Sequence, residues 1–286
     1  MRRCLSNSGS WLLTSGYWWI VSLNLIDTHV HLDDDRLRGE LAAVVQRAMD
    51  TGVTRMICIA TDAESARHGV AYAQQFESVY ASVGIHPNYA HEASPGDWEA
   101  MVEMVKSPKV VALGETGLDR HWDTTPFAMQ QDYFARHLAL SRQSGLPVVI
   151  HCREAEADML PMLAADCAAH GPIKGVMHSF CGDQAFAESC LQMGLYLSFS
   201  GMVTYKKATG LQAILAVVPE DRILVETDAP YLTPEPMRGK VKKNEPAYVV
   251  HTAAYLAAMR GVGLEEFGRV TTINACNLFH LPVQSY

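Results

Sequence analysis

The chain alternates between short runs of β-branched and other apolar residues and longer segments with helical spacing, starting at Leu23. The strand-like runs cover residues 23–27, 55–60, 79–85, 109–115, 147–151, 174–178, 195–200 and 222–227. Between these runs, apolar residues recur three and four positions apart, as in Leu41, Val44 and Ala48, which indicates helices with one face packed on a sheet. The pattern therefore predicts an α/β protein built from successive strand–helix units.

The spacing of the runs predicts the architecture. Their ends lie 22 to 36 residues apart, which is the length of one strand–helix unit, and eight units in about 260 residues match a closed barrel. We therefore predict a single (β/α)8 TIM barrel over residues 22–286. An open doubly wound sheet is the alternative, but no GxGxxG motif follows the first run and the chain contains no P-loop.

Residues 1–21 precede the pattern and are expected to form an N-terminal extension that is poorly ordered or not native. They begin with two arginines and contain three tryptophans, so a signal peptide has to be considered. A Thr-Ser-Gly stretch at 14–16 interrupts the apolar part, and no small-residue cleavage site follows it. We therefore favour an extension, or an upstream start codon, over a signal peptide.

Composition limits the class of protein. Hydrophobic residues make up 49% of the chain and charged residues 19%, and the apolar stretches are far shorter than the roughly 20 residues that cross a bilayer. A folded protein without a membrane partner is expected. The net charge of −8 excludes a long basic surface for duplex DNA, so any nucleic-acid contact has to be local. Seven scattered cysteines without a CxxC pair suit reduced thiols and a cytoplasmic location.

The carboxyl ends of the runs carry the candidate chemistry, because these ends meet at one mouth of a barrel. The motifs there are DTHVH, GIHP, GETGLD, IHCRE, MHSF and ETDAP. The candidate metal ligands within them are His29, His31, Glu115, His151, His178 and Asp228. His29 and His31 are two apart on a strand, so both side chains leave the same face and can chelate one ion. One such histidine would more often be structural, but four histidines and two carboxylates at the ends of five strands indicate a metal site.

This ligand set is too large for one tetrahedral ion and predicts two divalent metal ions, each with a position open to water or substrate. Imidazole and carboxylate suit Zn, Mn or Fe, whereas Mg prefers more oxygen, so the identity of the metal stays open among these. Cys152 follows His151 directly, but adjacent strand residues point to opposite faces. We therefore expect Cys152 to pack outward and not to act as a ligand or nucleophile.

The sequence resembles the TatD family of metal-dependent deoxyribonucleases, a branch of the amidohydrolase-like barrels. The segments that carry the resemblance lie in the family order within about residues 23–282 and read DTHVHLD, GIHP, GETGLD, PVVIHCRE, HSFCG, SFSGMVTYKKA, ETDAPYL and KNEPAYV. The resemblance implies that one ion is held by His29, His31, Glu115 and Asp228, and that a second is held by Glu115, His151 and His178. Glu115 would then bridge the two ions. The chain departs from the family at Lys243, where an arginine usually precedes NEP, so a point charge replaces a bidentate fork.

Three further residues are predicted to bind substrate, namely His86, Arg153 and Lys243. His86 ends the third run, where it either fixes a turn or, as the resemblance implies, faces the metals and contacts a phosphate oxygen. Arg153 lies two residues past the histidine of the fifth run and shares its direction, so it either reaches an anionic substrate or is solvated. Lys243 belongs to a basic loop at 238–243 that either binds phosphate beside the metals or is a solvated loop.

We interpret the chain as a cytoplasmic, metal-dependent phosphodiester hydrolase, specifically a deoxyribonuclease that trims single-stranded DNA ends or short segments. Asp228 and Glu115 are the predicted catalytic residues, and Asp228 would take the proton from a metal-activated water. The aromatic loop residues Trp122, Tyr205 and Tyr231 either stack with bases or only pack.

Two other classes of function stay open at this point. A deaminase or amide hydrolase on a related barrel would use Glu154, three residues after His151, as a proton donor, a spacing that resembles that of purine deaminases. Glu115 argues against this class, because those mononuclear enzymes do not require a bridging acid there. A barrel that binds metal or nucleic acid without turnover is the third class, and the complete ligand set argues against it.

Overall fold

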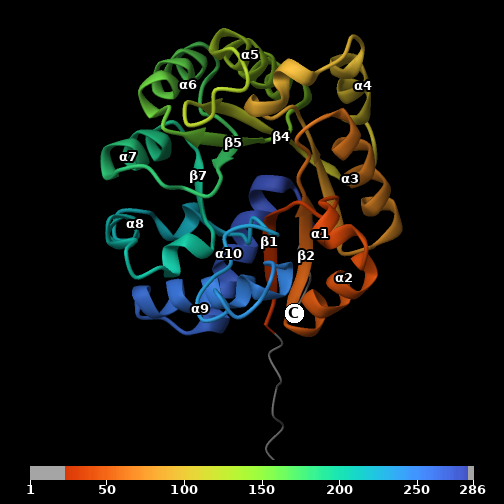
Figure 1. The fold of residues 1–286 in the computed structure, drawn as a ribbon. Coiled ribbons are helices and arrows are strands. Elements are labelled where there is room, and N and C mark those ends of the chain that lie inside the picture. The colour runs from red at the N-terminus through yellow and green to blue at the C-terminus, as the bar shows by residue number, and fades with distance from the viewer. Residues whose placement is uncertain (1–22, 283–286) are drawn as a thin grey trace, which may run out of the picture.

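The computed structural model describes residues 23–282. Within them, eight parallel strands follow one another around a barrel in chain order, each hydrogen-bonded to the next (Figure 1). Their bounds are β1 Leu25–Val30, β2 Val53–Cys58, β3 Val79–Val83, β4 Val110–Asp119, β5 Val148–Arg153, β6 Gly175–Met177, β7 Tyr196–Phe199 and β8 Ile223–Val225. The predicted (β/α)8 TIM barrel is confirmed. The predicted extension over residues 1–21 lies outside the described residues.

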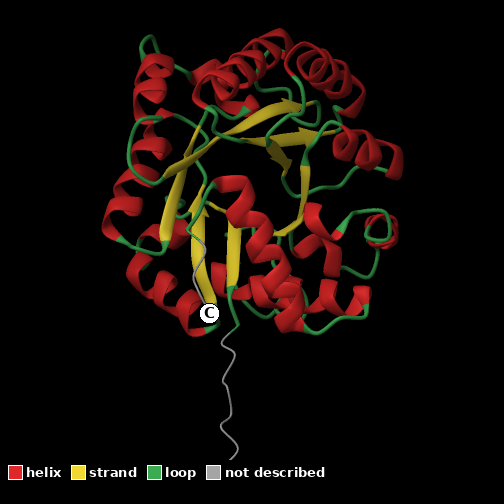
Figure 2. Ribbon diagram, turned by 180° about the vertical axis from the view of Figure 1, so that it is seen from behind, coloured by secondary structure: helices red, strands yellow, loops and turns green. Residues whose placement is uncertain are grey.

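Helices alternate with the strands and surround the barrel (Figure 2). The α-helices are α1 Asp35–Arg38, α2 Leu41–Asp50, α3 Ala63–Gln75, α4 Asp97–Met104, α5 Phe127–Ser144, α6 Glu156–His170, α7 Gln184–Gln192, α8 Thr209–Ile214, α9 Val249–Arg260 and α10 Leu264–Phe279. The 3-10 helices are η1 Pro87–Glu92, η2 Gly201–Thr204, η3 Glu220–Arg222 and η4 Pro246–Tyr248. Across residues 23–282, every helix is too short or too polar to span a bilayer.

Hydrogen bonds between the ends of β8 and β1 close the barrel. The carboxylate of Asp27 accepts the backbone N–H of Thr227 at 2.9 Å and its hydroxyl at 2.5 Å. A parallel bridge between Val30 and Ala229 lies just beyond. Burial raises the pKa of Asp27 to about 7, although the bonds from Thr227 oppose this shift. These contacts bring the carboxyl ends of the first and last strands side by side.

Apolar side chains fill the interior of the barrel and the layer outside it. One buried cluster joins Ile26, Ile57, Val149 and Leu224, from four different strands, to Phe279 of α10. Because these strands surround the barrel axis, this cluster fills the interior. A larger buried cluster packs the strands against the surrounding helices. The rigid packing of both layers fixes where the strand ends point.

β4 extends further than the sequence pattern predicts. It continues to Asp119 because GETGLD stays paired with β5, with Gly117 opposite His151 and Asp119 opposite Arg153. Gly117 is required there, since its φ is +143° and a Cβ atom would lie 2.0 Å from the carbonyl oxygen of His151. The long strand therefore carries Glu115 and Asp119 together to the mouth of the barrel.

Candidate metal centre

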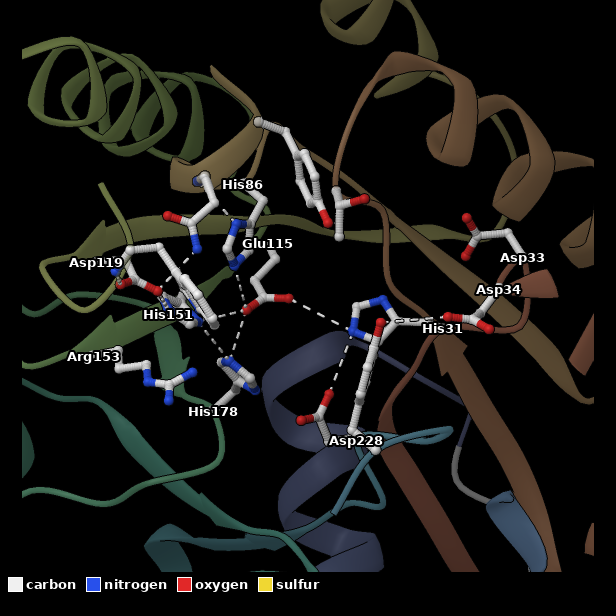
Figure 3. Close-up of a pocket in the computed structure, with 15 residues that line it drawn as sticks. His31, Asp33, Asp34, His86, Glu115, Asp119, His151, Arg153, His178 and Asp228 are labelled. Carbon is white, nitrogen blue, oxygen red and sulfur yellow. Dashed lines mark hydrogen bonds and ion pairs between the residues drawn. The ribbon is translucent and has the colours of Figure 1, made fainter. Parts of the chain in front are cut away.

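The six predicted metal ligands converge at the carboxyl ends of the strands. Five of them, all except the fully buried His29, line a pocket of about 490 Å³ (Figure 3). The complete lining is His31, Asp33, Asp34, Thr61, His86, Asn88, Tyr89, Glu115, Asp119, Trp122, His151, Arg153, His178, Asp228 and Tyr231. The pocket combines imidazoles, carboxylates and exposed aromatic rings, so both metal chemistry and substrate binding have candidates in one place.

Glu115 occupies the middle of the cluster, and its two carboxylate oxygens face different groups of imidazoles. Oε2 lies 3.3 Å from Nε2 of His29 and 3.8 Å from Nε2 of His31. Oε1 lies 2.9 Å from Nδ1 of His151 and 2.8 Å from Nε2 of His178. The carboxylate is 3% exposed, so these contacts form in a desolvated environment. One side chain therefore connects two sets of nitrogen donors.

Asp228 completes the set on the Oε2 side. Its Oδ1 lies 3.3 Å from Nε2 of His31 and 3.6 Å from Nε2 of His29, and these two nitrogens are 3.2 Å apart. The ligand atoms of the three residues all lie within 4.8 Å of one another. The backbone N–H of Asp228 donates to the carbonyl of His29, so barrel closure sets this distance. The group has the donor types and the separations that a divalent ion requires.

In three of the candidate ligand histidines, the ring nitrogen that points away from Glu115 and Asp228, called the outer nitrogen here, faces a hydrogen-bond acceptor. Nδ1 of His31 lies 3.2 Å from the carbonyl oxygen of Ile59, Nε2 of His151 lies 2.9 Å from Oδ2 of Asp119, and Nδ1 of His178 lies 3.3 Å from Oε1 of Glu226. In the neutral ring a proton on the outer nitrogen leaves the lone pair on the inner one, which faces the cluster. These rings are oriented as metal-bound histidines usually are.

His86 has the opposite arrangement. Its Nδ1 accepts the backbone N–H of Asn88 at 3.1 Å, so the proton of the neutral ring sits on Nε2. That nitrogen lies 3.4 Å from Oε1 of Glu115. His86 is therefore placed as a hydrogen-bond donor at the edge of the cluster and not as a donor of a lone pair.

The electrostatics favour a bound cation. Burial would raise the pKa of the Glu115 carboxyl, but the charge of His178 and the hydrogen bond from His151 hold that pKa well below its usual range. Burial would likewise lower the pKa of His31, but the hydrogen bond and charge of Asp228 raise it to about 9. Protons on the imidazoles thus balance the buried carboxylates, and a metal ion would displace those protons.

Arg153 and Lys243, both predicted to bind substrate, have different surroundings. The guanidinium of Arg153 lines the pocket, lies 5.9 Å from the ring centre of Trp122, and has no acidic partner among residues 23–282. The ammonium of Lys243 does not line the pocket. It contacts the carboxylate of Glu40 and the carbonyl of Arg36. The structure therefore brings Arg153 to the site and ties Lys243 to the segment that precedes α2.

Glu154, the proton donor of the deaminase alternative, is also absent from the pocket. Its carboxylate lies 2.7 Å from Nδ1 of His121 and is mostly exposed. Cys152 does not line this pocket and packs in part against the outer apolar cluster, but it lines an adjoining pocket that also includes His151, His178 and Asp228. Burial raises the pKa of its thiol, which makes the thiolate less accessible.

Sequence reasoning missed Asp119 and Glu226, the acidic partners of the outer histidine nitrogens. Both are almost fully buried. Both also lie inside quoted strand-end motifs, GETGLD and ETDAP. An acidic residue two or four positions from a candidate ligand, on the same strand or directly after it, is the signal that could have identified them.

A (β/α)8 barrel with a buried imidazole–carboxylate cluster at its mouth is typical of the class of metal-dependent hydrolases. Residues 26–280 match the family described as TatD related DNase. The uncharacterized metal-dependent hydrolase YabD of Bacillus subtilis (strain 168) is 37% identical over 257 residues, covering 90% of this chain and 99% of YabD. The 3'-5' ssDNA/RNA exonuclease TatD of Pantoea vagans is 34% identical over 268 residues, covering 90% of this chain and 100% of that protein.

A solved structure agrees with this placement. The crystal structure of YJJV, a TatD homolog from Escherichia coli K12, superposes with a TM-score of 0.84 at 30% identity, covering 92% of this chain and 100% of YJJV. The chain belongs to the TatD family, and the resemblance seen in its motifs is confirmed.

Proposed function

We propose that the protein is a deoxyribonuclease that uses two divalent metal ions to trim single-stranded DNA ends. The observation that carries this proposal is the position of the Glu115 carboxylate, because its two oxygens face separate sets of imidazoles. A carboxylate between two donor sets is the arrangement expected of a bridging ligand in a binuclear hydrolase. The exonuclease name of the Pantoea vagans relative supports the choice of a nucleic-acid substrate.

The proposed ligands follow from the inner lone pairs of His31, His151 and His178 and from the position of His29 beside Oε2 of Glu115. His29, His31 and Asp228 would hold one ion with Oε2 of Glu115, and His151 and His178 would hold the other with Oε1. When bound, such ions lower the pKa of a water molecule and polarise the phosphoryl oxygens. The set of imidazole and carboxylate donors fits Zn or Mn better than Mg.

The side chains around the ligands supply proton transfer and phosphate binding. Asp228 lies at the open side of the cluster and would accept the proton of the attacking water as the oxygen bonds to phosphorus. The bond from phosphorus to the leaving sugar oxygen then breaks, and that oxygen takes up a proton from Asp228 or from solvent water to become a hydroxyl. Nε2–H of His86 and the unpaired guanidinium of Arg153 are available to the phosphate oxygens.

The proposal includes a cytoplasmic location. The six cysteines within residues 23–282 are all free, which suits a reducing compartment.

A substrate panel tests the proposed function. The chelated protein and the protein restored with Zn²⁺ or Mn²⁺ would be assayed on single-stranded DNA, duplex DNA, RNA, a chromogenic phosphodiester and adenosine. We expect metal-dependent hydrolysis that is fastest on single-stranded DNA, and no deamination of adenosine. Deamination without DNA hydrolysis would contradict the proposal.

A further inference from the structure

The two walls of the metal pocket differ in charge. Arg153 lies on the side of β4 and β5, and Asp33 lies on the opposite side, after β1 (Figure 3). Arg153 has no carboxylate within ion-pair distance, and Asp33 has no cation within that distance, among the residues that the structure describes. The two unpaired charges therefore act on whatever enters between them, and the candidate metal ligands lie between the two walls.

Exposed aromatic rings also gather at this pocket. Of the described Phe, Tyr and Trp residues, Tyr89, Trp122 and Tyr231 are the exposed ones, at 42%, 53% and 47%, and all three line the pocket. Exposed rings cost hydration free energy unless a partner covers them, and a nucleobase is a suitable partner because its flat face stacks on an aromatic ring. Their concentration around one mouth indicates that bases bind there.

Each wall combines one aromatic ring with its charge. The guanidinium of Arg153 lies near the ring of Trp122, and these two residues form the basic wall. On the other side, the hydroxyl of Tyr231 lies 3.4 Å from Oδ2 of Asp34. Asp34 pairs with Arg36, and the guanidinium of Arg36 lies 4.3 Å from the ring centre of Tyr231. The net negative charge of this side comes from the unpaired Asp33, and Asp33, Asp34 and Tyr231 form the acidic wall. A base and a phosphate can bind together at the basic wall. At the acidic wall a base can bind, but a phosphate meets the unpaired carboxylate of Asp33.

We infer that a strand end binds across this pocket in one orientation, with its terminal nucleoside on the acidic wall and the rest of the strand leaving past the basic wall. The terminal hydroxyl would face Asp33, whose unpaired carboxylate accepts a hydrogen bond from a hydroxyl and repels a phosphate. The site therefore selects ends that carry a hydroxyl group. This inference rests on the proposed nuclease function and explains why such an enzyme would act on ends.

Selection for a hydroxyl end is tested with two single-stranded oligonucleotides that differ only at the digested end, where one carries a hydroxyl and the other a phosphate. With the metal-loaded full chain, we expect kcat/KM to be roughly tenfold higher for the hydroxyl end. Asp33→Asn should reduce this ratio at least threefold, because it removes the repelling charge. Both rates come from one protein preparation, so incomplete folding or metal loading cancels in the ratio.

Asp35→Asn is the matched control. It removes the same charge two residues further on, but Asp35 is exposed, pairs with Arg38 and does not line the pocket. Its ratio should equal that of the unmodified protein. An unmodified protein that cleaves both ends equally, or an Asp33→Asn variant with an unchanged ratio, would overturn the inference and leave the nuclease function standing. An unmodified protein that cleaves neither oligonucleotide would overturn both.

A second comparison tests the basic wall. Lengthening the substrate from two to four nucleotides should lower KM in the unmodified protein, because more phosphates then reach Arg153. Arg153→Gln should lose most of this gain. Arg120→Gln should keep it, because Arg120 already pairs with Asp158 and does not line the pocket. A full length dependence in Arg153→Gln would contradict the assigned direction of the strand.

Discussion

The group that faces the outer ring nitrogen distinguishes the histidines of this protein by role. The outer nitrogens of His151 and His178 face carboxylates. The outer nitrogen of His86 instead accepts a hydrogen bond from a backbone N–H. The same side chain is thereby prepared either to offer a lone pair or to offer a proton. Sequence motifs identify the histidines, but the partner that sets each tautomer lies on another strand or in another loop.

Asp119 provides a test of this effect as a positioning residue. Its Oδ2 lies 2.9 Å from Nε2 of His151, and its Oδ1 accepts the backbone N–H groups of His121 and Trp122. We predict that Asp119→Asn weakens binding of the second metal ion by roughly 10- to 100-fold. Metal titration followed by calorimetry measures this change, with Asp158→Asn as the control, because the half-buried Asp158 pairs with Arg120 and does not line the pocket. Unchanged metal affinity in Asp119→Asn would refute the positioning role.

His137 links stability to pH away from the metal cluster. It is fully buried, its Nδ1–H donates to the carbonyl of Tyr133, and its Nε2 accepts the N–H of Ile85. Burial lowers its pKa from 6.5 to about 4, although the bond to Tyr133 opposes this shift. Between pH 6.5 and pH 4, His137 therefore takes up a proton in the unfolded chain but stays neutral in the folded chain. Stability from this group is present above pH 6.5 and is lost as the pH falls toward 4.

We predict that this histidine alone removes about 2 kcal/mol of unfolding free energy between pH 7 and pH 5. Urea unfolding of the chelated protein at both pH values measures the loss. His137→Gln should show a smaller loss, and the exposed His170→Gln should match the unmodified protein. Equal pH dependence in all three proteins would contradict the prediction.

At the scale of elements, the strand positions were predictable because each strand is a short apolar run followed by a polar motif. The true length of β4 was not, because its last residues pair with β5 through a glycine-containing segment that reads as a loop. The two shortest strands, β6 and β8, have only three residues each and are shorter than the apolar runs that predicted them. Strand ends depend on pairing with neighbours, which a single sequence does not display.

The close approach of β4 to β5 gives a prediction for this pair of strands. Gly117→Ala places a methyl group against the carbonyl of His151 and forces a side chain into a φ of +143°. We expect it to lower the unfolding free energy by about 2 kcal/mol or more and to displace His151. Thermal unfolding and metal content check this, with Gly210→Ala as the control, since nothing lies within 4 Å of its added methyl. A stable variant with full metal content would contradict it.

At the scale of the whole molecule, barrel topology gathers residues from distant parts of the chain at one mouth. That convergence made the six metal-ligand candidates recognisable from sequence, because strand ends of a (β/α)8 barrel meet regardless of loop details. Lys243 and Glu154 show what the sequence could not determine. Both lie in loops on the expected face of the barrel. Lys243 pairs with Glu40 and Glu154 pairs with His121, so neither charged group points into the pocket.

The central claim is that hydrolysis depends on two ions connected by Glu115. The most direct test titrates Mn²⁺ into the chelated protein and records bound metal per chain against the rate of single-stranded DNA hydrolysis, in parallel for Glu115→Gln. We predict that activity appears as the second ion binds, and that Glu115→Gln binds less metal and is inactive at every ratio. Full activity with one ion per chain, or normal hydrolysis by Glu115→Gln, would contradict the claim.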